Sequence, residues 1–158
     1  MKAYQTISLK QIIVLLVMII VSYGCDVRQS QLQERNGLFY KINSETPYTG
    51  RMVAKYPNGQ KQHECTYKDG KQEGTGTWWH SNGQKLAEHT YKDGKLEGTL
   101  TEWHENGQKK QEVTYKDGKL EGTGTGWHEN GQKKFEGTYK DGKPINKKSW
   151  DKDGNRLD

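Results

Sequence analysis

The stretch Tyr115-Lys116-Asp117-Gly118-Lys119-Leu120-Glu121-Gly122, followed by Trp127-His128 and Asn130-Gly131, decides the fold, because the same pattern recurs along the chain. Tyr-Lys-Asp-Gly-Lys occurs at 67–71, 91–95, 115–119 and 139–143, and Asn-Gly-Gln-Lys occurs at 58–61, 82–85, 106–109 and 130–133. The common period is 24 residues, which is typical of a repeat architecture. Four full units follow from it, at 50–73, 74–97, 98–121 and 122–145.

Each unit predicts two strands and two tight turns. Asn-Gly and Asp-Gly favour two-residue type I′ turns, which need a positive φ at both central positions. The segments between them are rich in Thr, Trp, Tyr and Val, which favour strands. We therefore expect an all-β fold, in which 24-residue hairpin repeats form one elongated, single-sheet antiparallel meander.

The turns also predict a register. With Asn82-Gly83 as a two-residue turn, Thr77 faces Glu88, Gly74 faces Tyr91 and Trp79 faces Leu86. With Asp93-Gly94 as the next turn, Ala87 faces Leu100. Both turns place Thr75, Thr77, Trp79, Leu86, Glu88 and Thr90 on one face, and Gly74, Gly76, Trp78, His80, Ala87, His89 and Tyr91 on the other. We expect the small Gly74 to make room for the ring of Tyr91.

Composition agrees with a thin sheet. Of 158 residues, 30% are hydrophobic and 19 are Gly, and 25 Lys and Arg stand against 20 Asp and Glu. So few apolar residues exclude a domain with a thick core of Leu, Ile and Val, or a bundle of amphipathic helices. The small positive excess does not indicate nucleic-acid binding.

The start of the chain has the three parts of a secretory signal, with Lys2 and Lys10 before the apolar run 12–21 and then small residues up to Cys25. Gly24-Cys25 resembles the lipobox of bacterial lipoproteins, which implies acylation of Cys25 after cleavage. Ser22 and Tyr23 depart from that pattern, and plain secretion and an uncleaved anchor are the alternatives. We therefore divide the chain into a signal peptide at 1–24, a lipid-anchored polar tether at 25–36 and a repeat array at 37–158.

The repeat unit resembles the bacterial variant of the MORN repeat, through Tyr115-Lys-Asp-Gly-Lys-Leu-Glu-Gly122, Trp127 and Asn130-Gly131. The resemblance covers residues 36–158. It implies a lipoprotein or secreted protein, and some members of that family are antitoxins of toxin–antitoxin systems. The resemblance also implies membrane association and protein scaffolding, which are roles of MORN arrays in general. A weaker resemblance connects the aromatic and glycine spacing to cell-wall-binding modules.

No constellation in the repeats predicts catalysis. Equivalent side chains of successive units lie two strands apart, about 9–10 Å, which is too far for His80, His104 and His128 to share a metal ion. Glu64, Glu88, Glu112 and Glu136 recur in identical surroundings, whereas a catalytic carboxylate pair needs two different ones. Cys65 is expected to be a small side chain packed in a strand. We expect no enzymatic activity, no metal and no cofactor.

With catalysis set aside, binding is the function that we expect. The candidate binding residues form the aromatic strip Trp78, Trp79, Trp103 and Trp127. The alternative is that this row only holds the sheet together. Lys71, Lys95, Lys119 and Lys143 at the turns indicate solvation and edge protection, with a lipid-headgroup stripe as the alternative. We expect a membrane-tethered lipoprotein on the exported side of the bacterial envelope, periplasmic or at the cell surface, which binds or scaffolds a protein. An antitoxin or immunity-type partner and a cell-wall glycan binder are the alternatives.

Overall fold

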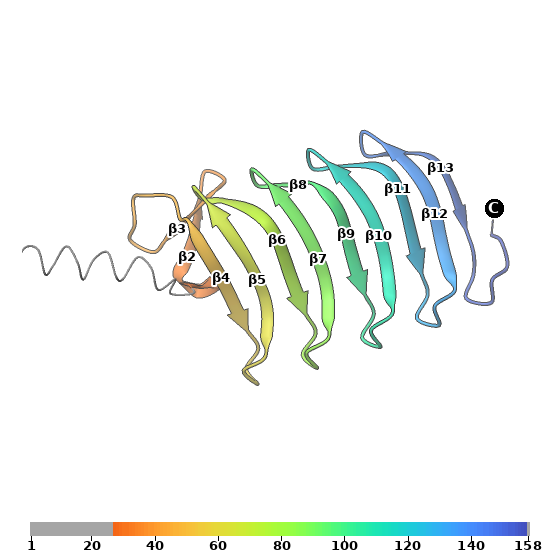
Figure 1. The fold of residues 1–158 in the computed structure, drawn as a ribbon, viewed down its shortest axis with the longest axis horizontal. Helices are drawn as coiled ribbons and strands as arrows, with labels where there is room; N and C mark the ends of the chain where they lie inside the picture. Colours follow the sequence, from red (N-terminus) through yellow and green to blue (C-terminus); the bar gives the residue numbers. More distant parts are fainter. Residues whose placement is uncertain (1–26, 158) are drawn as a thin grey trace, which may run out of the picture.

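The computed structural model describes residues 27–157, which form an elongated, gently curved row of strands (Figure 1). The elements are β1 Val27–Arg28, η1 Gln29–Gln31, β2 Leu32–Arg35, β3 Leu38–Lys41, β4 Gly50–Lys55, β5 Lys61–Lys68, β6 Lys71–Trp79, β7 Lys85–Lys92, β8 Lys95–Leu96, β9 Gly98–Trp103, β10 Lys109–Lys116, β11 Lys119–Trp127, β12 Lys133–Lys140 and β13 Lys143–Ser149. This part of the chain contains no α-helix. The expected signal peptide and Cys25 lie outside the described residues.

One large sheet contains most of the strands, in the order β1-β4-β5-β6-β7-β9-β10-β11-β12-β13, with β8 also paired to β7. From β4 onward the pairs are antiparallel and follow chain order, so the predicted meander is confirmed. Two features were not expected. β1 pairs with β4 in parallel, and β2 and β3 form a separate two-stranded sheet.

Residues 27–35, expected as part of a polar tether, instead form β1, η1 and β2. The physical reason is that Val27 and Leu32 are apolar and pack against other apolar side chains of the first repeats. Val27 is buried with Tyr48, Met52 and Cys65, and Leu32 and Phe39 lie against this cluster. The β2–β3 hairpin is therefore a second layer over the first repeats, and we call it the cap.

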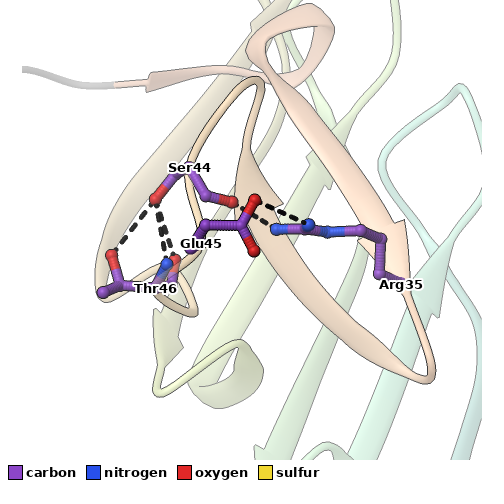
Figure 2. A network of polar contacts seen from close by, with 4 residues as sticks. All are labelled: Arg35, Ser44, Glu45 and Thr46. Atoms are coloured by element: carbon purple, nitrogen blue, oxygen red, sulfur yellow. Dashed lines mark hydrogen bonds and ion pairs between the residues drawn. The ribbon is translucent and has the colours of Figure 1, made fainter.

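The loop that follows the cap hairpin is tied back to it by Arg35, as Figure 2 shows. The Arg35 guanidinium donates a hydrogen bond to the carbonyl of Ser44 and lies 3.5 Å from the carboxylate of Glu45. It also lies over the ring of Tyr40, 3.9 Å from the ring centroid. The Ser44 hydroxyl accepts a hydrogen bond from the N–H of Thr46 at 3.2 Å, which closes the loop. These contacts hold the loop against the cap hairpin.

The two turn types of each repeat differ. At Asp93-Gly94 both residues have positive φ, 51° and 80°, as the type I′ prediction requires. At Asn82-Gly83 only the glycine does, so the prediction was wrong there. The N–H of Gly83 bonds the carbonyl of His80 at 2.9 Å, and the N–H of His80 bonds the carbonyl of Gln84 at 2.8 Å. This makes a longer turn, and a bulge beside it pairs Trp79 with Lys85 instead of with Leu86.

The register across the Asp-Gly turns was also partly wrong. Tyr91 pairs with Leu96 next to the turn, as a two-residue turn requires, but Ala87 pairs with Glu102 instead of the predicted Leu100. The β8–β9 side therefore has two more residues than β7 over this stretch, and they are accommodated around Gly98, whose φ is +79°. Gly74 and Gly122 have the same conformation at the same place in their units, with φ of +76° and +82°. These glycines form a bulge. Gly74 pairs with Tyr91 as predicted, but the Tyr91 ring does not lie over it, since a Cβ at Gly74 would meet nothing within 4 Å.

Candidate functional site

The Glu–Thr face of the sheet carries one unbroken row of paired side chains. Each of these residues faces the next across neighbouring strands, in the order Glu64, Thr77, Glu88, Thr101, Glu112, Thr125 and Glu136. Thr pairs with Glu at every step, so no two carboxylates face each other directly. Such cross-strand pairs are the unit of stabilisation in a sheet. The row runs from β5 to β12 and gives this face a regular pattern of charge.

A lysine in each unit joins the carboxylate row to the tryptophan row. Its ammonium group lies 2.5–2.6 Å from the glutamate three residues later, in the pairs Lys61–Glu64, Lys85–Glu88, Lys109–Glu112 and Lys133–Glu136. The same ammonium lies over the tryptophan of the next unit, at 5.3 Å for Trp79, 5.5 Å for Trp103 and 5.4 Å for Trp150. These distances suit a cation–π contact. Lys109 and Trp127 line one shallow depression.

The expected aromatic strip is therefore divided. Trp79, Trp103 and Trp127 are half-buried at equivalent places in successive units, and the lysines cover the rings of Trp79 and Trp103. Trp78 pairs with His63 and Ala87 on the other side of the sheet. Adjacent strand residues point to opposite faces, so Trp78 and Trp79 never act on one surface.

The opposite face, which we call the apolar face, holds the buried residues Cys65, Tyr67, Ala87, Leu100 and Val113. Cys65 is 2% exposed, and Gln72 donates a hydrogen bond to its sulfur at 3.6 Å. Burial raises the pKa of the Cys65 thiol, which keeps it in the unreactive protonated form. This agrees with the packing role expected for Cys65.

Trp78 is held between two histidines on the apolar face. Its ring is 4.1 Å from that of His63, stacked at 14°, and 4.5 Å from that of His89. Burial, with a smaller contribution from His89, lowers the pKa of His63 to about 4, and burial also lowers the pKa of His89. The Nε2 atoms of both rings are buried and have no hydrogen-bond partner among residues 27–157. Both imidazoles are thus held neutral, and sequence reasoning missed this cluster because it spans three strands.

The second histidine row has a structural role. His80, His104 and His128 donate from Nε2 to the carbonyl of a tryptophan in the next unit, Trp103, Trp127 and Trp150, at 3.4, 3.0 and 3.0 Å. An asparagine row runs beside it. Asn58, Asn82, Asn106 and Asn130 donate from Nδ2 to a carbonyl one unit further on, at 2.7–3.4 Å. Each Asn oxygen also accepts the backbone N–H two residues later, so the repeated Asn is used within and between units.

The Asp-Gly turns of successive units are linked by glutamate carboxylates. Glu73, Glu97 and Glu121 accept the backbone N–H of Asp93, Asp117 and Asp141, at 2.9–3.0 Å. The first turn lacks such a glutamate, and Thr49 takes its place by accepting from the N–H of Asp69 at 2.9 Å. The side chains that recur most faithfully in the sequence therefore serve contacts between successive units.

Two hollows lie at the ends of the array. One, of about 700 Å³, is lined by Arg28, Gln29, Ser30, Val53, Ala54, Lys55 and Gln62. The other, of about 400 Å³, is lined by His128, Lys134, Phe135, Lys147, Ser149, Trp150, Asp151, Lys152 and Leu157. Within the described part of the chain, no group of three His, Cys, Asp or Glu side chains converges as metal ligands. Over the same range, no helix has the length and apolar character needed to cross a bilayer.

Comparison with known proteins agrees with the repeat. A family model described as "MORN repeat variant" matches residues 48–69, 72–93, 96–117 and 120–141, which together make up more than half of the chain. A comparison with curated proteins gave no match. A solved structure titled "Crystal structure of GtfA/B complex bound to UDP and GlcNAc" is similar at 12% identity and a TM-score of 0.24. The match covers 84% of this chain and 33% of that one.

Proposed function

This chain belongs to the family of MORN repeat variants, and from that premise we propose that it is a protein-binding scaffold of the bacterial envelope, anchored by acylated Cys25. Repeats of this family generally form modules that bind proteins or membranes. The finer assignment, to a lipoprotein with a protein partner, rests on the N-terminal pattern and on the geometry of the array.

The observation that carries the proposal is the periodic surface. The Glu–Thr face presents the same Glu–Lys–Trp arrangement in successive units, with nearly identical Lys–Glu distances of 2.5–2.6 Å. A partner that makes a modest contact with one unit can repeat it with the next, and linked contacts strengthen one another. Arrays of this kind use their extended surfaces for binding.

The same regularity is the reason why we assign no reaction to the repeats. Glu64, Glu88, Glu112 and Glu136 each have their own lysine within 2.6 Å. The pKa of Glu136 is lowered by Lys133, and that of Glu64 is lowered to about 2, mainly by the hydrogen bond from Arg51. A general acid needs its pKa raised towards the working pH. Glu64 and Glu136 are accordingly suited to ion pairing.

The proposed anchor comes just before β1 in the sequence. Val27 is two residues after Cys25 and is already paired in β1. Replacing Cys25 by Ser should abolish incorporation of labelled fatty acid and leave the precursor uncleaved, because acylation needs the thiol. Cys65→Ser is the matched control and should keep the label. Labelling of the Cys25→Ser protein would refute the anchor and leave the binding role untouched.

The binding role is tested by site-specific photo-crosslinking in the native envelope, with the products identified by mass spectrometry. A crosslinker at Thr101 probes the Glu–Thr face, and one at Gln111 probes the apolar face. We expect one defined protein adduct from at least one face, and its loss in a competition with unlabelled protein. Adducts to lipid or glycan alone would contradict the proposal. Retention on peptidoglycan that is lost in Trp103→Ala would assign the protein to glycan binding instead.

A further inference from the structure

The outer edge of β13 lacks a strand partner in the described chain. β13 pairs with β12 on one side and is the last strand in the sheet order (Figure 1). On its other side, Leu157 donates its N–H to the carbonyl of Ser149 at 2.9 Å. Residues 143–148 have no strand beyond them within residues 27–157. An open edge of this kind is a template for pairing with another strand.

The backbone after β13 is shaped as if a further strand followed. The N–H of Asp151 bonds the carbonyl of Asn155 at 3.0 Å, and the N–H of Gly154 bonds the carbonyl of Asp151 at 3.2 Å. These are the bonds that His80, Gly83 and Gln84 make in the second unit. In that unit the next strand, β7, pairs with β6 along its length. At β13, Arg156 and Leu157 lie at the corresponding position, and Arg156 forms an antiparallel bridge with Trp150.

The charge around this edge is positive. β13 carries Lys143, Lys147 and Lys148 and no acidic residue. Lys134 and Lys152 line the hollow beside it. Two of the nearby carboxylates are held by other groups of the chain. Glu136 lies between Lys133 and Lys148, at 2.6 and 3.7 Å, and Asp151 accepts hydrogen bonds from Asp153 and Asn155 at 2.8–3.0 Å. The edge therefore attracts negative charge.

Apolar groups complete the surface. The hollow of about 400 Å³ beside the end of β13 is walled by Phe135, Trp150 and Leu157. Leu157 is 65% exposed, and Ile145 on β13 is 64% exposed. Ammonium groups lie over two of the aromatic rings, Lys147 over Phe135 at 5.3 Å and Lys133 over Trp150 at 5.4 Å. An apolar side chain fits this hollow, which Lys134, Lys147 and Lys152 also line.

We propose that the open edge of β13 receives an extended, acidic segment of a partner protein, which adds to the sheet as a strand. Its backbone bonds residues 145–148, which follow Pro144 and its missing N–H. Its carboxylates meet Lys147 and Lys152, and one large apolar side chain enters the hollow. Strand addition of this kind draws affinity from the main chain and specificity from side-chain pockets. A second copy of β13 is disfavoured, because its lysines would meet these lysines. This inference rests on the proposed protein-binding function and narrows it to one edge.

The test uses the full chain and a short synthetic peptide in which Glu alternates with Val around one central Phe. Binding is measured by fluorescence anisotropy of the labelled peptide. We expect saturable binding that weakens about tenfold or more in Lys147→Glu/Lys152→Glu, because both charges facing the peptide are reversed. Leu157→Glu should weaken it as well, through the hollow. Lys92→Glu/Lys116→Glu makes the same charge change far from β13 and should bind like the natural protein.

Two further peptides distinguish pairing as a strand from simple attraction between opposite charges. A peptide of the same charge with Pro in place of alternate Val cannot pair as a strand, and a peptide with Lys in place of Glu has the wrong sign. Neither should bind. Equal binding of the Pro peptide, or equal loss in Lys92→Glu/Lys116→Glu, would overturn the proposal. So would protein dimers in sedimentation that disappear in Lys147→Glu/Lys152→Glu. A crosslinked envelope partner that is unaffected by these variants would refute the edge and leave the binding function standing.

Discussion

The two ends of the array are built from the same repeat and differ in how much they bury. At the capped end, the β2–β3 hairpin covers the first strands, so Met52, Cys65 and Tyr67 are each 3% exposed or less. At the open end, no second layer of described residues covers β12 and β13, and Ile145 is 64% exposed. The cluster of buried apolar residues in this thin sheet thus forms where another part of the chain folds over it.

Between the ends, the sheet buries side chains by its own packing. Leu100 and Val113 are each 6% exposed although the hairpin does not reach them. At the neighbouring Gly124, a Cβ would lie 3.0 Å from both Val113 and the ring of Tyr139. The glycine lets these two side chains close over the sheet. The middle units therefore depend on their neighbours alone, which makes the two ends separable by experiment.

The largest expected effect comes from shortening the middle. Deleting 98–121 removes one unit and joins Glu97 to Gly122, which has the same φ as Gly98 to within a few degrees, +82° against +79°. This variant should fold, remain rich in β-structure by circular dichroism and melt somewhat lower, because only unit and interface terms are lost. Deleting 98–109 reverses the direction of every later strand, and that variant should fail to fold. Equal unfolding of both would show that the ends are not independent.

The next largest effect comes from truncating one large apolar side chain at each end. Met52→Ala should lower the free energy of unfolding by about 2–5 kcal/mol, because it leaves a cavity beneath the cap. Ile145→Ala removes a similar apolar group at the open end, where it is 64% exposed, and should change stability by less than about 0.5 kcal/mol. Urea unfolding of both variants measures the difference. Similar losses would mean that the cap does not form the core described above.

A glycine pair isolates the contribution of the cap to one turn. Gly70 and Gly142 occupy equivalent Asp-Gly turns, with φ of +80° and +83°. A Cβ at Gly70 would lie 3.0 Å from Leu38 Cβ and 3.1 Å from the Phe39 carbonyl, whereas at Gly142 it would meet nothing within 4 Å. Gly142→Ala should cost about 1 kcal/mol from the positive φ alone. Gly70→Ala should cost about 1–3 kcal/mol more, because it also crowds the cap. Thermal melts of the two variants provide the comparison.

The smallest expected effect is a dependence on pH confined to the capped half. The pKa of His63 is about 4 in the fold against 6.5 for an unperturbed histidine, and that of His89 is also lowered. Because the unfolded chain binds protons first, stability is complete above about pH 6.5 and is lost as the pH falls towards about 4. Because the ring is only partly buried, we expect the free energy of unfolding to fall by about 1–2 kcal/mol between about pH 7.5 and about pH 5.

His63→Phe keeps the stacking on Trp78 and should flatten this dependence. His104→Gln leaves both rings beside Trp78 in place and should retain the full loss of stability. Melting temperatures of the three proteins at the two pH values decide the matter. A His63→Phe protein as sensitive to acid as the natural one would show that the stack is not responsible.

Several features were readable from the residues. The period, the strand content and the division of residues between two faces follow from local patterns, because Asp-Gly specifies a tight turn and side chains alternate along a strand. Trp78 and Trp79 belong to opposite faces for the same reason. Their grouping in one candidate strip went against that alternation, and the lysine over Trp79 was not foreseen, because it comes from another unit.

What the sequence by itself determined is therefore the repeat, its turns at Asp-Gly and the face of each residue. The tertiary structure decided the pairing partners and the cap. A slip of two residues at Gly98 leaves every side chain on its face, so the alternation gives no signal of it; only the positive φ of that glycine reveals it. The cap joins Val27 and Leu32 to Met52 and Cys65 across the β2–β3 hairpin, and no local pattern encodes a contact that forms only when distant segments bury apolar surface together.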